Sequence, residues 1–213
     1  MATTLTTIRA RVRQDLHDED SSNYRWTDAV LERHIARALR ELSNAIPREQ
    51  KTTLSTSAGS RDLSISSLTD MVRVVAVEYP TGQYPPLYVG YSIWQTTLTL
   101  LIDDAPGGAE DVNVYWHRLH TLDSSTSTLD ASNEDILVPG AAGYAALDWA
   151  SFASNRVNVG GEATYRYYKD FADTALAFFH GELRRVGLSG CVRTNQLYSP
   201  ALPKPSQNTD PGP

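Results

Sequence analysis

The chain has 213 residues, of which 41% are hydrophobic and 21% charged, and its formal net charge is −6. This composition is typical of a soluble globular protein with a sizeable core, and the negative charge argues against a surface built to hold DNA or an anionic membrane. No apolar run approaches the roughly 20 residues that cross a bilayer. The single cysteine, Cys191, excludes an internal disulfide and a cysteine-based zinc site.

The N-terminal residues lack the basic start, apolar block and cleavage site of a signal peptide, so we expect synthesis in the cytosol. Among the basic residues, sixteen are Arg and only three are Lys. Arg forms bidentate pairs with carboxylates and keeps its charge when partly buried, which suits subunit interfaces. A GC-rich genome would produce the same bias, so the composition leaves both explanations open.

The first predicted helix covers residues 4–16 and is followed by a polar, acidic loop over 17–23. The second covers residues 26–47 and has the clearest signals in the chain. Thr27 is a good N-cap, Trp26 and Leu31 have the spacing of a hydrophobic staple, and Pro47 ends the run. An apolar stripe of period 3.6 runs along the helix, while its other face is rich in arginine. The two helices form a predicted hairpin.

After Pro47 the pattern changes from period 3.6 to period 2. Two short runs, 54–57 and 63–65, read as a hairpin, and 71–79, 96–102 and 112–117 read as further strands. About six short strands in this block predict a small antiparallel sheet or barrel that packs to bury its apolar face. From residue 121 to residue 133 the chain has no periodicity, which indicates either an ordered excursion or a mobile loop.

Pro139 is well placed in the first turn of a third helix, which is rich in small residues that allow two helices to approach closely. VNVGG, at 157–161, predicts a break. The fourth helix is expected over about 162–186, with a seam of alternating three- and four-residue steps and Gly187 as the C′ residue. The seam contains Tyr165, Tyr168, Ala172, Ala175, Phe179, Leu183 and Val186.

The sequence therefore predicts an α+β protein in which four helices form a bundle and the sheet or barrel is an insertion. The predicted boundaries are 1–50 and 134–187 for the bundle, 51–122 for the β domain, 123–133 for a loop, and 188–213 for an extended or disordered tail.

A search for chemistry finds little. His117 and His120 are the closest histidine pair, but residues three apart on a strand point to opposite faces and cannot share a metal. The acidic pairs fall in or beside turns, and the loop at 103–111 lacks the ligand spacing of an EF-hand. No nucleophile motif or phosphate-binding loop is present. We expect no enzymatic activity, no metal and no cofactor.

The order of elements, including YRWTDAVLERHIARALRELSNAIP, VYWHRLHTL and EDILVPGAAGYAAL, resembles the head–tail connector (adaptor) proteins of tailed bacteriophages over residues 1–187. The resemblance implies a structural protein of the virion neck that forms a ring, commonly of twelve subunits. It also implies docking on the portal, contact with the next head-completion or tail component, and passage of double-stranded DNA without specific binding. No membrane partner is implied, and synthesis would occur in the host cytoplasm.

Such a ring is heterologous and closed, so each subunit presents two different faces to its neighbours. On the second helix, the candidate subunit-interface residues are Arg33, Arg37, Arg40 and Glu41. In the tail, the candidate portal-docking residues are Leu197, Tyr198 and Leu202.

The alternative is a carbohydrate- or receptor-binding β module of a virion tail or baseplate. It rests on aromatic residues of the β block that either bind sugars or fill a small core: Tyr79, Tyr84, Tyr88, Tyr91, Trp94 and Tyr115.

Overall fold

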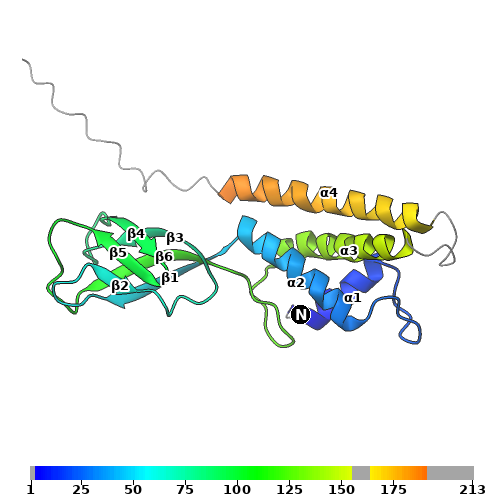
Figure 1. Ribbon diagram of the computed structural model, residues 1–213, viewed down its shortest axis with the longest axis horizontal. Coiled ribbons are helices and arrows are strands. Elements are labelled where there is room, and N and C mark those ends of the chain that lie inside the picture. The colour runs from blue at the N-terminus through cyan, green and yellow to red at the C-terminus, as the bar shows by residue number, and fades with distance from the viewer. Residues whose placement is uncertain (1–2, 155–163, 191–213) are drawn as a thin grey trace, which may run out of the picture.

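The computed structural model describes residues 3–154 and 164–190. Within them the chain runs through two helices, six strands and two further helices, which confirms the predicted α+β class. Figure 1 shows that the strands form one lobe and the helices another, joined by β1 and by the segment that follows β6. We call these the β lobe (β1–β6) and the helical lobe (α1–α4).

The first two helices are α1 (Leu5–Asp15) and α2 (Asp28–Ala45), as the sequence predicted. The hydroxyl of Thr4 accepts the amide N–H of Thr7, and that of Thr27 accepts the amide N–H of Val30, so both N-caps are formed. Caps at both starts and buried apolar side chains along one face of each helix explain why these segments are helical.

The third helix, α3 (Ala131–Ser154), begins eight residues before Pro139, so the prediction that Pro139 marks its first turn was wrong. Asp130 provides the start, because its carboxylate accepts the amide N–H of Asn133 at 2.8 Å, as an N-cap does. Pro139 lies inside the helix, where it removes one backbone donor.

The fourth helix, α4 (Thr164–Gly190), continues past Gly187, so the prediction of a C′ glycine there was also wrong. A Cβ at position 187 would lie 3.5 Å from the carbonyl oxygen of Ala45, at the end of α2, which shows how closely the two helices approach. Of the predicted seam, Ala172, Phe179 and Leu183 are buried, whereas Tyr165 is exposed. The break predicted at 157–161 lies outside the described residues.

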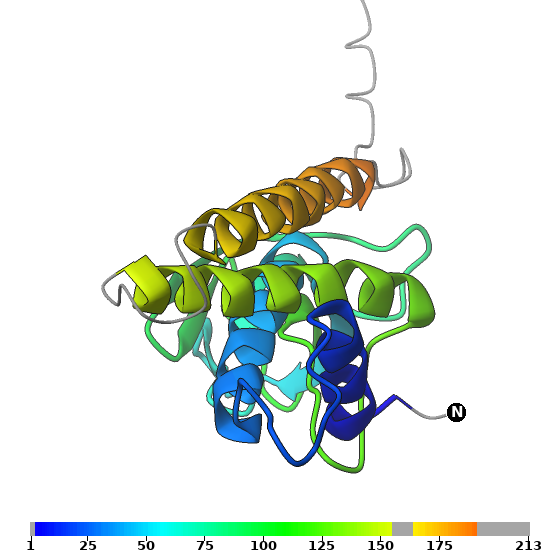
Figure 2. The ribbon, with the colours of Figure 1, turned by 90° about the vertical axis from the view of Figure 1, so that its right-hand side faces the viewer.

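The helical core joins all four helices. Figure 2 shows α3 lying between α4 and the α1–α2 pair. Gly140 and Gly143 of α3 bring α4 close, because a Cβ at Gly140 would lie within 2.7 Å of the Phe179 ring and one at Gly143 within 2.9 Å of Leu176. The small residues of α3 therefore allow the close helix packing that the sequence suggested.

The β lobe consists of two three-stranded antiparallel sheets that enclose a second hydrophobic core. The first has the order β1-β6-β3, with β1 at Arg48–Ser55, β6 at Asp111–Arg118 and β3 at Met71–Glu78. The second has the order β2-β5-β4, with β2 at Asp62–Ser64, β5 at Thr97–Leu101 and β4 at Gly90–Trp94.

The predicted hairpin between 54–57 and 63–65 is wrong, because β1 pairs with β6 and β2 pairs with β5. The two segments diverge at residues 56–61 into different sheets. Each strand pairs instead with a strand that carries fully buried apolar side chains, namely Val112 and Val114 on β6 and Leu98 and Leu100 on β5.

The segment from 119 to 130 is an ordered connection between the lobes. Leu122 and Ser127 form an isolated antiparallel bridge, and the carboxylate of Asp123 accepts the amide N–H groups of Ser125 and Thr126. These bonds hold the pKa of Asp123 far below its usual range. Of the two alternatives for this segment, the structure therefore supports the ordered excursion.

Candidate assembly surfaces

The arginine-rich face of α2 is exposed, as the apolar stripe required, but most of its charges bind within the chain. Arg33 pairs with Asp148 of α3 at 3.2 Å, where His34 also approaches at 3.6 Å. His34 is buried, and desolvation lowers its pKa. Arg33 thus helps to attach α2 to α3, although its side chain is still largely exposed.

Arg37 and Glu41 belong to a polar cluster that joins three helices. The guanidinium of Arg37 lies 3.9 Å from the ring centre of Tyr144, on α3. The Tyr144 hydroxyl donates to the carboxylate of Glu41 at 2.7 Å, and His180 of α4 lies 3.3 Å from the same carboxylate. Burial and this carboxylate raise the pKa of Tyr144 to about 12. Both candidate residues therefore stabilise the helical lobe.

Arg40 differs from the other three candidates. It is exposed, and among the described residues it has no ion pair or hydrogen bond. Of the four predicted interface residues, Arg40 is therefore the one whose charge is most available to a second protein.

A second exposed surface lies along α4, and we call it the α4 stripe. Tyr167, Phe178 and Leu188 are 72%, 51% and 66% exposed, and Phe171 lies half-buried among them. Their spacing of four, seven and ten residues places them on one side of a helix with 3.6 residues per turn. Sequence reasoning identified the neighbouring seam but missed this stripe, although the same spacing was visible.

The α4 stripe faces away from α2. Residues two positions apart on a helix point roughly 200° apart, so Phe178 and His180 lie on nearly opposite sides of α4. His180 points to Glu41 of α2, and Phe179 between them packs into the core. The helical lobe therefore presents an arginine on α2 and an aromatic stripe on α4 in different directions.

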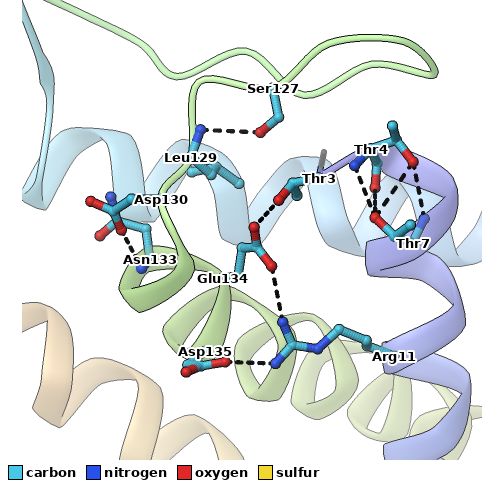
Figure 3. Close-up of polar contacts among 10 residues, drawn as sticks. All are labelled: Thr3, Thr4, Thr7, Arg11, Ser127, Leu129, Asp130, Asn133, Glu134 and Asp135. Carbon is cyan, nitrogen blue, oxygen red and sulfur yellow. Dashed lines mark hydrogen bonds and ion pairs between the residues drawn. The ribbon is translucent and has the colours of Figure 1, made fainter. Parts of the chain in front are cut away.

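The start of α3 is tied to α1 and to the N-terminal segment (Figure 3). Arg11 pairs with Glu134 at 3.1 Å and with Asp135 at 2.6 Å, and the hydroxyl of Thr3 also donates to Glu134. The amide N–H of Leu5 donates to the carbonyl oxygen of Asp123. These contacts attach the connection between the lobes to the helical lobe.

The loop between α1 and α2 is organised by a buried charge. Arg13 pairs with Asp18 at 2.5 Å and with Asp28 at 2.7 Å, and its guanidinium lies 3.5 Å from the ring centre of Tyr24. Arg13 and Asp18 are almost fully buried. A cavity of about 560 Å³ adjoins this loop and is lined in part by Arg25 and Trp149. Asp18, which also lines this cavity, binds Arg13 and accepts the amide N–H of Arg25, so its carboxylate is used within the loop.

The aromatic residues of the β lobe do not form a common platform. The hydroxyls of Tyr79, Tyr91 and Tyr115 bind Glu110, the carbonyl oxygen of Val74 and Glu78, respectively. The bond to Glu78 raises the pKa of Tyr115 to about 12. Tyr84 and Trp94, in contrast, are 95% and 82% exposed.

The two histidines that are closest in the sequence lie in different parts of the structure. His117 lies on β6 beside Arg73, whereas His120 lies in the connection and contacts Thr128 and the carbonyl oxygen of Ile46. Among the described residues no group of three or more His, Cys, Asp or Glu side chains is placed to hold a metal ion, and no helix is long and apolar enough to cross a membrane. The tail candidates Leu197, Tyr198 and Leu202 lie outside the described residues, as does Cys191.

Comparison with protein families gives a match along nearly the whole chain. Residues 3–189 match the family described as SU10 adaptor protein. The match covers both lobes and all ten elements except Gly190, the last residue of α4. No curated protein matches the chain.

Proposed function

Because this chain belongs to the SU10 adaptor protein family of phage head–tail adaptors, we propose that it forms a ring that docks on the portal and joins the DNA-filled head to the tail. Family membership assigns the chain a structural role in the virion neck, in contact with head and tail components. The ring, the portal contact and the DNA conduit are the parts that we propose.

The observation that supports the ring is the uncovered α4 stripe. Exposed apolar side chains that gather on one surface of a protein mark sites of interaction with other proteins. A closed ring needs two different faces that complement each other on adjacent subunits. Arg40 on α2 and the α4 stripe point in different directions, and guanidinium groups bind favourably to aromatic faces. We therefore place Arg40 of one subunit against the α4 stripe of the next.

The net charge of −6 supports a conduit that does not hold DNA. A lumen that neutralised many phosphates would bind the passing duplex and slow its movement, because affinity for DNA comes mainly from basic contacts to phosphates. For portal docking we retain the tail residues Leu197, Tyr198 and Leu202 as candidates. We propose that the protein has no catalytic activity.

The test of the ring is Phe178→Asp in the full-length chain, with Leu101→Asp on the β lobe as the matched control. Both positions are more than half exposed, so neither change should unfold the monomer. In mixtures with portal protein, electron microscopy should show rings for the wild type and the control and none for Phe178→Asp. Rings that are unaffected by Phe178→Asp would contradict the proposed interface.

A second candidate function is glycan or receptor binding by the β lobe, which the exposure of Tyr84 and Trp94 favours. Binding of the full-length chain to a glycan array, lost in Trp94→Ala, would support this function. We rank it second because other aromatic hydroxyls of the β lobe are bound internally.

A further inference from the structure

The β lobe has an open edge at β4, the outermost strand of the sheet β2-β5-β4. The hydrogen bonds of β5 define its orientation. Leu100 donates its amide N–H to Arg61, and Thr96 accepts the amide N–H of Ile65. The even-numbered residues of β5 therefore direct their backbone groups toward β2, and the odd-numbered ones direct theirs toward β4.

This pattern determines which backbone groups of β4 point outward. Tyr91 lies opposite Leu100 and Ile93 lies opposite Leu98, so the N–H and C=O groups of Tyr91 and Ile93 face away from β5. Among the described residues, no backbone hydrogen bond outside the sheet reaches either of them. Val89, two residues earlier on the same edge, does donate to Val77 of β3, so this edge is capable of strand pairing.

The other edge strands are protected against such pairing, whereas β4 is not. β1 carries Arg48, Glu49 and Lys51, and β2 has only three residues. The outer edge of β3 is already partly occupied, because Val77 accepts the amide N–H of Val89 and the carbonyl oxygen of Val74 accepts the hydroxyl of Tyr91. β4 reads Gly-Tyr-Ser-Ile-Trp and contains neither a charge nor a proline. Ile93 is 36% exposed and Trp94 is 82% exposed. An uncharged, apolar edge with free backbone groups is the kind of surface to which proteins add a strand from a partner.

The charges around this edge indicate the chemistry of the partner. Asp62 of β2 lies opposite Thr99 of β5, and Thr99 in turn lies opposite Ser92 of β4. Asp103 and Asp104 are exposed and follow the end of β5, which lies opposite the first residue of β4. None of the three acids forms an ion pair among the described residues. Two cations also lie near this edge, because Arg61 donates to the carbonyl oxygen of Asp103 and the charge of Arg73 acts on Tyr91. The three acids outnumber them, so a segment that carries Lys or Arg would bind better than an acidic one.

We propose that the open edge of β4 binds an extended, basic segment of another virion protein, which adds to the sheet β2-β5-β4 as a fourth strand. The segment is short, because β4 has five residues, and it places one apolar side chain against Ile93 on one face of the sheet and another against Trp94 on the opposite face. The identification of its source as a neck protein rests on the proposed function, whereas the edge and its charge preference do not.

The probes are two synthetic peptides with the same alternating Val-Thr core, one flanked by Lys and the other by Glu. We expect the Lys-flanked peptide to shift the amide resonances of Tyr91 and Ile93 in the full-length chain and to bind at least tenfold more tightly than the Glu-flanked one. Equal affinity for both peptides, or shifts at β1 instead of β4, would overturn the proposal.

The variant is Ile93→Pro, which removes an outward N–H group without removing a hydrogen bond to β5. Ser55→Pro on β1 is the matched control, because Ser55 is also an odd-numbered residue of an edge strand whose even-numbered residues face β6. Ile93→Pro should abolish peptide binding and Ser55→Pro should preserve it. If Ile93→Pro does not fold, Ile93→Lys should repel the Lys-flanked peptide and lower its affinity at least tenfold; unchanged binding would overturn the proposal.

The two proposals fail in different ways. Ile93→Pro should still form rings with the portal while its particles fail to join the next component. If Ile93→Pro fails to form the ring, β4 is a contact between subunits and the inference about β4 is overturned. The proposal that the wild-type chain forms a ring would still stand.

Discussion

Replacing Gly140 with Ala tests whether the close approach of α3 and α4 holds the helical lobe together. A Cβ at position 140 would lie 2.7, 2.8 and 2.9 Å from three atoms of the Phe179 ring. Contacts this short force a neighbour to move, and the Phe179 side chain is fully buried within the helical core, where side chains are close-packed. We therefore expect Gly140→Ala to destabilise the protein.

The magnitude follows from two opposing effects. Overpacking a well-packed core costs about 1–3 kcal/mol. Ala in place of Gly inside a helix stabilises the helix by up to about 1 kcal/mol, because Ala has the higher helix propensity. Because the ring at position 179 cannot move into solvent, the cost should lie in the upper part of its range. The net expectation is a decrease of about 1–2 kcal/mol in the free energy of unfolding.

The matched control is Gly181→Ala on α4, where an added Cβ would meet no atom within 4 Å. It has the same gain in helix propensity without the clash, so it should stabilise the protein by about 0.4–1 kcal/mol. Urea unfolding followed by far-ultraviolet circular dichroism measures both changes. A Gly140→Ala variant as stable as Gly181→Ala would refute the close packing of the two helices.

Three further outcomes are expected in the same unfolding assay. Arg13→Met should cost about 3–5 kcal/mol because it leaves a buried carboxylate unpaired, and a loss below about 0.5 kcal/mol would contradict the burial of this pair. Leu42→Ala, at a fully buried site, should cost about 2–5 kcal/mol, and Leu39→Ala, which is only partly buried, should cost less; the reverse order would argue against the observed face of α2. The pKa of Tyr144 is raised to about 12, so its contribution to stability is complete below pH 10 and is lost as the pH rises from 10 to 12. The stability difference between wild type and Tyr144→Phe should therefore shrink over this range, and a difference that stays constant from pH 10 to 12 would contradict the raised pKa.

The helices that the sequence predicted best are those whose ends carry local signals. Thr27 and Pro47 bound α2 closely because an N-cap and a proline act through neighbouring residues alone. At α3 two such signals competed, and the Asp130 cap outweighed Pro139 because the helix tolerates one missing donor in its interior. Gly187 resembles a C-cap in sequence, but its place beside Ala45 depends on another helix and is invisible locally.

Strand partners and surface roles depend on contacts between distant residues, and the sequence predicted them less well. The period-2 pattern located most strands, but it did not show that β1 pairs with β6, about sixty residues away. Likewise, the arginine face of α2 was predicted as a surface, yet only the fold reveals that Arg37 and Glu41 bind Tyr144 and that Arg40 stays available.

The most direct test of the central claim is the mass and shape of the complex that the full-length chain forms with its native portal. We expect electron microscopy and mass measurement to show a closed ring stacked coaxially on the portal, with a ring mass close to twelve times 23.5 kDa if the stoichiometry follows the resemblance. A chain that stays monomeric and leaves the portal unbound at concentrations near those of assembly would contradict the account.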